Sequence, residues 1–156
     1  MLSVESLMKR DPVSVDAAAS VADAARRMRE ARVGAVLVLE RGRLAGILSE
    51  RDVLNRVVAE GRSPDGTKAA DVASRPVVSV PAGASLRQCA ETLRDRGVRH
   101  LPVLDAAGVP VGVLSARDFF EAVAGGLERL LERSRYDEQL RANVDPYDHL
   151  GGSYGR

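Results

Sequence analysis

The apolar residues of the chain recur at two spacings, which separate helical from extended segments. After Ser20 and again after Ser85, apolar residues return every three or four positions, and mostly polar residues fill the positions between them. This spacing predicts two amphipathic helices, and the serine before each one is placed to cap the first turn with its side-chain oxygen. The apolar positions are Val21, Ala24, Ala25 and Met28 in the first helix and Leu86, Cys89, Ala90 and Leu93 in the second.

A run rich in β-branched residues follows each of these helices. The segments 34–39 and 43–49 flank Arg41-Gly42 and predict a hairpin, and "RHLPVLD", "AAG" and "VPVGVLS" predict a second one. Pro102 in the second hairpin indicates an edge strand or a bulge. A short "VSV" strand precedes each amphipathic helix, and a further helix follows each hairpin, over about 50–59 and 116–132. Each half is therefore predicted as β-α-β-β-α, an α/β (α+β) fold.

The two halves are copies of one another. Residues 10–39 align with 75–104 at an offset of 65, and one extra residue in the second turn raises the offset to 66. Each copy has about 60 residues, a size that is marginal for a stable core, so we expect two homologous lobes packed together. The predicted parts are a first domain over 2–60, a linker over 61–70, a second domain over 71–125, a C-terminal helix over 126–143 and a disordered tail over 144–156.

The predicted C-terminal helix lies outside the repeat and carries a stripe of apolar side chains. Such a stripe packs against a second copy of the chain, against its own core or against another partner, and we favour contact between two copies in a homodimer. The stripe consists of Leu127, Leu130, Leu131 and Tyr136.

Composition narrows the classes of function. Lys and Arg number 23 against 22 Asp and Glu, so the charge gives no reason to expect nucleic acid or an anionic membrane as partner. The five aromatic residues, none of them tryptophan, give no support for a base-stacking platform. The single cysteine fits a reducing compartment. With two histidines and one cysteine, the sequence gives no support for a metal cluster. The N-terminal segment lacks the apolar run of a signal peptide. We therefore expect a cytoplasmic protein that requires no cofactor.

The strongest chemical signal is a motif that occurs once in each copy. "GILSERDVL" and "GVLSARDFF" both place a hydroxyl, a guanidinium and a carboxylate where a strand gives way to a helix. Serine and aspartate at that place are also good helix-capping residues. Capping and ligand binding are therefore both open from the motif alone.

The tandem β-α-β-β-α order and the two motifs resemble a pair of CBS domains, named after cystathionine β-synthase. "LMKRDPVSV" at the start of the first copy and "VRHLPVLD" in the second add to the likeness, which covers about residues 2–124. It is similar to stand-alone bacterial CBS pairs that carry no enzyme domain. The resemblance implies two lobes related by a pseudo-twofold axis, with adenosine-containing ligands such as AMP, ADP, ATP, NAD or S-adenosylmethionine bound in two clefts between them.

The resemblance also implies a role for each motif residue. The carboxylates would accept hydrogen bonds from the ribose hydroxyls, the serines and arginines would contact phosphate, and a valine of each short strand would flank adenine. Arg99 and His100 stand where the family places basic phosphate contacts, whereas their counterparts are Gly34 and Ala35. The clefts should therefore differ in phosphate affinity, although His100 as an ordinary strand residue is also open. The predicted ligand contacts are Val13, Ser49, Arg51, Asp52, Val78, Arg99, His100, Ser115, Arg117 and Asp118.

Three functions are compatible with these patterns. We favour a regulatory, homodimeric module that senses an adenine nucleotide or related adenosyl ligand. The alternative is a structural dimerisation module with degenerate, empty clefts. The third function is an enzyme, for example a hydrolase that uses Ser49 or Ser115 with His100. The sequence shows no residues that would orient His100 as a general base, so we expect no catalytic activity.

Overall fold

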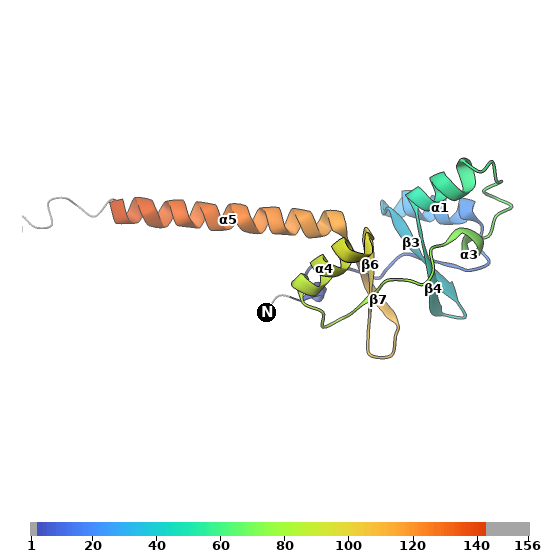
Figure 1. Cartoon of the computed structure of the whole chain (residues 1–156), viewed down its shortest axis with the longest axis horizontal. Coiled ribbons are helices and arrows are strands. Elements are labelled where there is room, and N and C mark those ends of the chain that lie inside the picture. The colour runs from blue at the N-terminus through green and yellow to red at the C-terminus, as the bar shows by residue number, and fades with distance from the viewer. Residues whose placement is uncertain (1–2, 143–156) are drawn as a thin grey trace, which may run out of the picture. The chain divides into compact units, whose positions relative to one another are not determined.

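The computed structural model describes residues 3–142 and contains two small sheets flanked by helices (Figure 1). One sheet has the order β2-β3-β4 and the other the order β1-β7-β6-β5. This mixed architecture confirms the predicted fold class. The strands are β1 (Lys9–Arg10), β2 (Ser14–Asp16), β3 (Ala35–Glu40), β4 (Arg43–Ser49), β5 (Val80–Pro81), β6 (His100–Leu104) and β7 (Pro110–Ser115).

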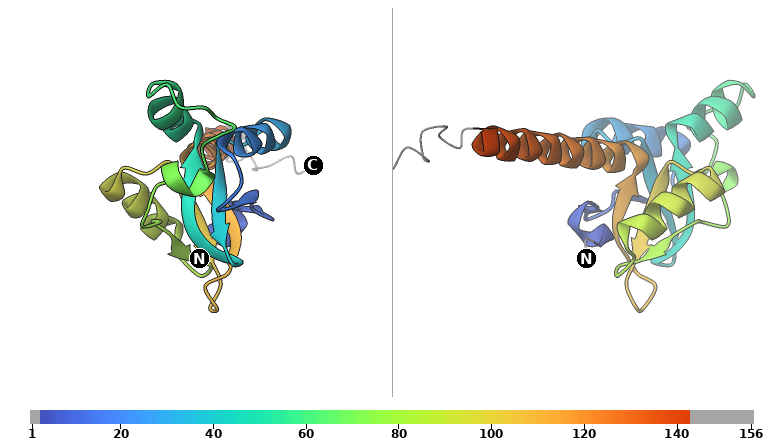
Figure 2. Two further views of the ribbon diagram at one scale, coloured as in Figure 1. Left: turned by 90° about the vertical axis from the view of Figure 1, so that its right-hand side faces the viewer. Right: turned by 60° about the vertical axis from the view of Figure 1, so that its left-hand side comes forward.

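The helices begin where the sequence predicts them. Ser20 accepts a hydrogen bond from the backbone N–H of Asp23 at 3.0 Å, and Ser85 accepts one from Gln88 at 3.2 Å, so both serines are N-caps. The helices are η1 (Val4–Ser6), α1 (Val21–Ala31), α2 (Glu50–Val53), which continues as the π-helical turn η2 (Leu54–Val58), α3 (Ala69–Val72), α4 (Leu86–Arg96) and α5 (Ala116–Ala142). Figure 2 shows these elements from two further directions.

Each repeat has a core of its own, but each core also contains a segment that belongs to the other repeat. Val4 of η1, at the start of the first repeat, is fully buried in the core of the second. Ala69 and Val72 of α3, at the start of the second repeat, are buried in the core of the first. The two repeats therefore exchange the segments through which the chain enters them.

Equivalent hydrogen bonds fix both exchanged segments. The N–H of Val4 donates to the carbonyl of Ala84 at 2.8 Å, and the N–H of Ala69 donates to the carbonyl of Ala19 at 2.8 Å. Residues 4 and 69, like residues 19 and 84, are related by the repeat offset of 65. The exchange is thus carried out twice with one geometry.

The exchanged segments continue along the last strand of the opposite hairpin. β1 pairs antiparallel with β7, and Ser74 forms a single bridge to Ile47 of β4. A Cβ added at Gly112 of β7 would lie 2.6 Å from the Sδ of Met8 and 2.9 Å from the carbonyl oxygen of Lys9. Glycine is needed at this position because the incoming backbone leaves no room for a side chain.

The sequence suggested an edge strand or a bulge at Pro102; the residue does not lie at a sheet edge, but the register of β6 against β7 shifts between Val103 and Leu104. β6 lies between β5 and β7, and Pro102 is fully buried opposite Val113. In the first repeat the N–H of Leu37 donates to the carbonyl of Val13 at 2.9 Å. Pro102 is the counterpart of Leu37 and has no N–H, so the carbonyl of Val78 lacks the matching donor. The proline is tolerated because only this one ladder hydrogen bond is lost.

The helix that follows the second hairpin is longer than its counterpart. Residues 116–142 form one continuous helix, α5, where the sequence suggested a helix over about 116–132 and a separate C-terminal helix over 126–143. The chain divides into a unit up to Phe119 and a unit from Phe120 onward. The predicted tail over 144–156 lies outside the described residues, and the predicted domain limits stay predictions.

Gly112→Ala should destabilise the protein, because the added methyl group collides with the exchanged segment at Met8 and Lys9. We expect a loss of about 1–3 kcal/mol in the free energy of unfolding, measured by urea denaturation. Gly83→Ala is the control, since a Cβ there meets nothing within 4 Å, and it should change stability by less than about 0.5 kcal/mol. Equal effects of the two substitutions would contradict the close approach.

Candidate functional site

The first motif caps the helix that follows β4. The Oγ of Ser49 accepts a hydrogen bond from the N–H of Asp52 at 3.2 Å and donates to the Oδ2 of Asp52 at 2.9 Å. The N–H of Ser49 donates to the same Oδ2 at 2.9 Å, which completes a capping box. One carboxylate oxygen of Asp52 is thus used by its own helix terminus.

The second motif forms two of these three hydrogen bonds where β7 joins α5. The Oγ of Ser115 donates to the Oδ2 of Asp118 at 2.7 Å and accepts from the N–H of Asp118 at 3.1 Å. The capping interpretation of the motif is therefore correct as a description of both copies. In both copies it occupies only Oδ2.

The other carboxylate oxygen of each aspartate faces the exchanged segment of the opposite repeat. The Nζ of Lys9 lies 3.4 Å from Oδ1 of Asp118, and the Oγ of Ser74 lies 3.4 Å from Oδ1 of Asp52. Positions 9 and 74 are equivalent in the repeat. Arg56, one turn along the same helical segment, also lies 3.4 Å from Oδ1 of Asp52. Each predicted ribose-binding carboxylate therefore stands at a junction between the two repeats.

His100 lies at the start of β6, next to the first repeat. A Cβ added at Gly34 would be 3.4 Å from the Nε2 of His100 and 2.7 Å from the Oε1 of Glu50. The imidazole of His100 and the carboxylate of Glu50 thus both lie next to Gly34, where no side chain separates them. Asp52 and Asp118 also act electrostatically on His100, so the ring lies within range of both motifs.

Burial is the main influence on the titration of His100. It lowers the pKa of the imidazole below the ordinary value of 6.5, because the charged form loses hydration. Glu50 opposes this shift most strongly among the charged neighbours, followed in turn by the smaller effects of Asp118 and Asp52, while the Arg99 cation adds to the lowering. His100 is consequently neutral near pH 7.

The remaining predicted contacts lie around this centre without meeting at one point. Arg51, Arg99 and Arg117 are exposed. Val13 packs against the core of the first repeat and Val78 against that of the second. The structure therefore brings His100 near both aspartates and leaves the two valines on separate lobes.

Four residues of this region were not singled out from the sequence. Lys9 and Ser74 are equivalent in the repeat, but equivalence does not say that each lies in the opposite lobe. Arg56 is one helical turn beyond Asp52, a spacing that is compatible with an ion pair. Glu50 occupies the variable position of the motif, where the second copy has alanine. This difference between the copies was the sequence signal that could have identified Glu50.

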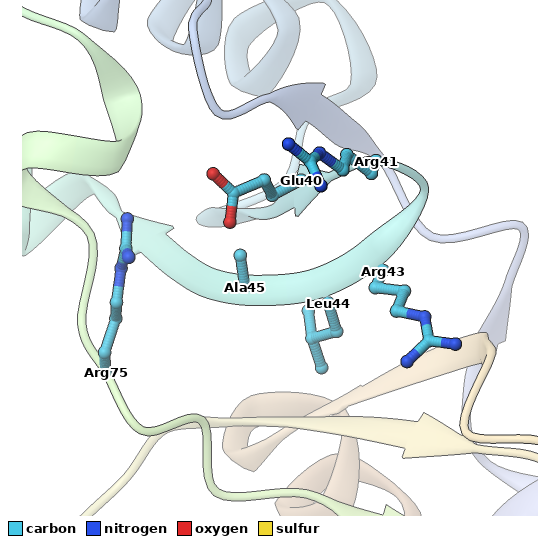
Figure 3. Close-up of a pocket in the computed structure, with 6 residues that line it drawn as sticks. All are labelled: Glu40, Arg41, Arg43, Leu44, Ala45 and Arg75. Carbon is cyan, nitrogen blue, oxygen red and sulfur yellow. The ribbon is translucent and has the colours of Figure 1, made fainter.

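A separate pocket of about 720 Å³ lies beside the β3–β4 hairpin (Figure 3). Figure 3 shows Arg75, at the start of the second repeat, toward one end of the β4 segment and Arg43 toward the other. The Nη2 of Arg75 donates to the carbonyl of Ala70 at 2.8 Å. None of the predicted ligand contacts lines this pocket, whose residues are Glu40, Arg41, Arg43, Leu44, Ala45 and Arg75.

Residues 3–142 contain neither a candidate membrane span nor a group of metal-ligating side chains. No helix in this range combines the length and apolar character needed to cross a membrane. Within the same range no three His, Cys, Asp or Glu side chains are grouped so as to hold a metal ion.

The family model and the similar proteins point to the same family. The family model described as the CBS domain matches residues 4–59 and 69–125. Protein MK0525 of Methanopyrus kandleri is 30% identical over 121 residues, which cover 77% of this chain and 62% of that protein. The chain therefore spans less than two thirds of this relative's length.

Solved structures share the fold. The CBS-domain containing protein ATU1752 from Agrobacterium tumefaciens superposes with a TM-score of 0.71 at 27% identity, over 78% of this chain and 98% of that one. CBSX2, solved in complex with AMP, superposes with a TM-score of 0.66 at 23% identity, over 80% of this chain and 98% of that one. At this identity, the likeness to CBSX2 shows a shared fold and nothing further.

The lowered pKa of His100 predicts how stability depends on pH. The unfolded chain protonates His100 near its ordinary value, whereas the folded chain resists protonation, so the unfolded state binds more protons as the pH falls below about 6.5. The stability that depends on neutral His100 is complete above this pH and is lost as the pH falls further. His100→Gln should show a smaller loss in the free energy of unfolding between pH 7 and pH 5, measured by urea denaturation. Parallel curves for the two proteins would contradict the assignment.

Proposed function

Because the chain belongs to the CBS-domain family, we propose that it is a regulatory module that binds an adenosine-containing ligand between its two repeats. The observation that carries the proposal is the position of the two motif carboxylates. Each has one oxygen held by its own helix terminus and the other directed at the opposite repeat. A ligand that engages this second oxygen contacts both repeats at once.

The proposed contacts follow the chemistry of a nucleotide. Oδ1 of Asp52 or Asp118 accepts hydrogen bonds from the ribose hydroxyls, in exchange for its contact with Ser74 or Lys9. Val13 and Val78 flank adenine, and the carbonyl of Val78 is able to accept from the adenine amino group because no donor comes from β6. Phosphate is contacted by the serines and arginines of the motifs, Ser49, Arg51, Ser115 and Arg117, and by Arg99 and His100.

Binding at a junction between repeats provides a route to regulation. A ligand shifts a conformational equilibrium only if it binds one arrangement more tightly than another. A ligand that replaces Lys9 or Ser74 at the carboxylate changes the contact between the exchanged segment and the opposite lobe. We propose that AMP, ADP, ATP, NAD or S-adenosylmethionine acts in this way as a regulatory ligand, in a cytoplasmic protein without catalytic activity. CBSX2 in complex with AMP supports this choice of ligand class.

A structural dimerisation module is the second candidate. The observation that favours it is that the protein's own groups already satisfy both carboxylates. Asp52 contacts Ser49, Ser74 and Arg56, and Asp118 contacts Ser115 and Lys9. A thermal-shift screen with the five ligands separates the two functions, since only a binding module is stabilised by mass action.

Asp118→Ala should weaken binding of the adenosyl ligand found in that screen by about 1.5–3 kcal/mol, because it removes charge-assisted hydrogen bonds to the ribose. Asp52→Ala should have the same effect at the other site. Isothermal titration calorimetry measures both affinities, and circular dichroism checks that each variant is folded. Unchanged affinity in the double variant would remove the aspartates from the ribose site.

The exposed apolar side chains of α5 should mediate a homodimer. Leu127 and Leu130 are 56% and 67% exposed, and one helical turn separates them. Leu127→Glu should therefore shift the protein from dimer to monomer in size-exclusion chromatography with light scattering, because it places charge in an apolar contact. Glu128→Gln, on the neighbouring position, is the control and should leave the dimer intact. A wild-type protein that is monomeric at high concentration would refute the dimer.

A further inference from the structure

Glu50 and His100 come together across the boundary between the repeats. Glu50 is the first residue of α2, and its N–H donates to the carbonyl of Gly34 at 3.0 Å. Its Oε1 then folds back over Gly34, next to the Nε2 of His100. This position is open only because Gly34 has no side chain, since a Cβ would lie 2.7 Å from Oε1.

The pseudo-symmetric position has none of these groups. The N–H of Ala116 donates to the carbonyl of Arg99 at 2.8 Å, as Glu50 does to Gly34. Ala116 is thus the counterpart of Glu50, and Ala35 is the counterpart of His100. The repeat preserves the backbone contact and changes only the charge beside it.

Glu50 differs from the motif carboxylates in its contacts. Asp52 and Asp118 both have cationic or hydroxyl partners at 3.4 Å. No hydrogen bond or ion pair to the Glu50 carboxylate occurs within residues 3–142. Its negative charge therefore has no ion-pair partner within residues 3–142 and lies beside a histidine that would otherwise donate to phosphate.

We propose that Glu50 is a specificity-determining residue that lowers the affinity of the site at His100 for ligands with a 5′-phosphate, relative to adenosyl ligands without one. This inference rests on the proposed adenosyl-binding function. A phosphate dianion at Arg99 and His100 experiences attraction from the guanidinium and repulsion from the Glu50 carboxylate. A neutral or cationic group in the same place is not repelled, so Glu50 shifts the preference of the site away from AMP and toward adenosine or a sulfonium.

The size of the effect follows from the exposure of Glu50. Because the residue is exposed, water and salt screen its charge, and we expect a change of about three- to tenfold in affinity rather than a larger one. The effect should shrink as ionic strength rises. It should also be confined to ligands with negative charge at the 5′ position.

The experiment compares AMP and adenosine by isothermal titration calorimetry on the wild type, Glu50→Gln and Glu60→Gln. Glu50→Gln should raise the affinity for AMP by about three- to tenfold at low salt and leave that for adenosine within about twofold. Glu60→Gln removes the same charge from an exposed position in the same repeat and should leave both affinities unchanged. Equal gains in the two variants would show that net charge acts non-specifically, and would overturn the proposal.

Gly34→Ala gives a second test that keeps the charge. The added methyl group must displace the flexible end of Glu50, so AMP affinity should rise in the direction of Glu50→Gln while the fold is kept. If neither AMP nor adenosine binds the wild type, the proposed function fails as well. If both bind and Glu50→Gln leaves their ratio unchanged, only the role of Glu50 is refuted.

Discussion

The exchange of entry segments between the repeats is the constraint on which the rest of the structure depends. Neither repeat completes its core alone, since Val4 fills a position in the second core and Ala69 in the first. A lobe of about 60 residues buries too little apolar surface to be stable by itself, and the exchange joins two such lobes into one folding unit. The glycines at 46 and 112 follow from it, because the incoming backbone passes directly over both.

The same exchange makes capping and the proposed ligand binding compatible at the motifs. Capping uses one carboxylate oxygen, which accepts two hydrogen bonds from Ser49 in Asp52 and one from Ser115 in Asp118. The second oxygen is then presented in a fixed direction, toward the exchanged segment. Capping therefore orients the group that the proposed ligand would contact, so the two roles support one another. A carboxylate without the serine would have to be ordered by the ligand, at a cost in conformational entropy.

Local signals in the sequence were sufficient for the elements and insufficient for the exchange. The caps at Ser20 and Ser85 and both hairpins depend on short-range spacing, which a sequence displays directly. The exchange depends on which lobe a segment enters, and the pattern is identical whether Val4 packs in its own lobe or in the other. The edge position suggested for Pro102 was wrong for a related reason. A proline is tolerated in an inner strand when only one ladder hydrogen bond is lost, and this depends on the neighbouring strand. Glu50 and His100 are 50 positions apart in the sequence, so no local spacing could reveal that they lie close together.

The differences between the repeats gather around a backbone frame that hardly changes. The hydrogen bonds made by residues 50 and 116 are equivalent, as are those made by residues 4 and 69. Substitutions at a few positions on this frame then alter charge and hydrogen-bonding capacity: glycine against arginine at 34 and 99, alanine against histidine at 35 and 100, glutamate against alanine at 50 and 116, and leucine against proline at 37 and 102. Because these differences leave the frame intact apart from the one ladder hydrogen bond that Pro102 cannot make, each changes the local chemistry without changing the fold. A duplicated module can in this way present two positions of different charge at a fixed geometry, and under the proposed function side chains such as Arg99, His100 and Glu50 would set the ligand preference of each.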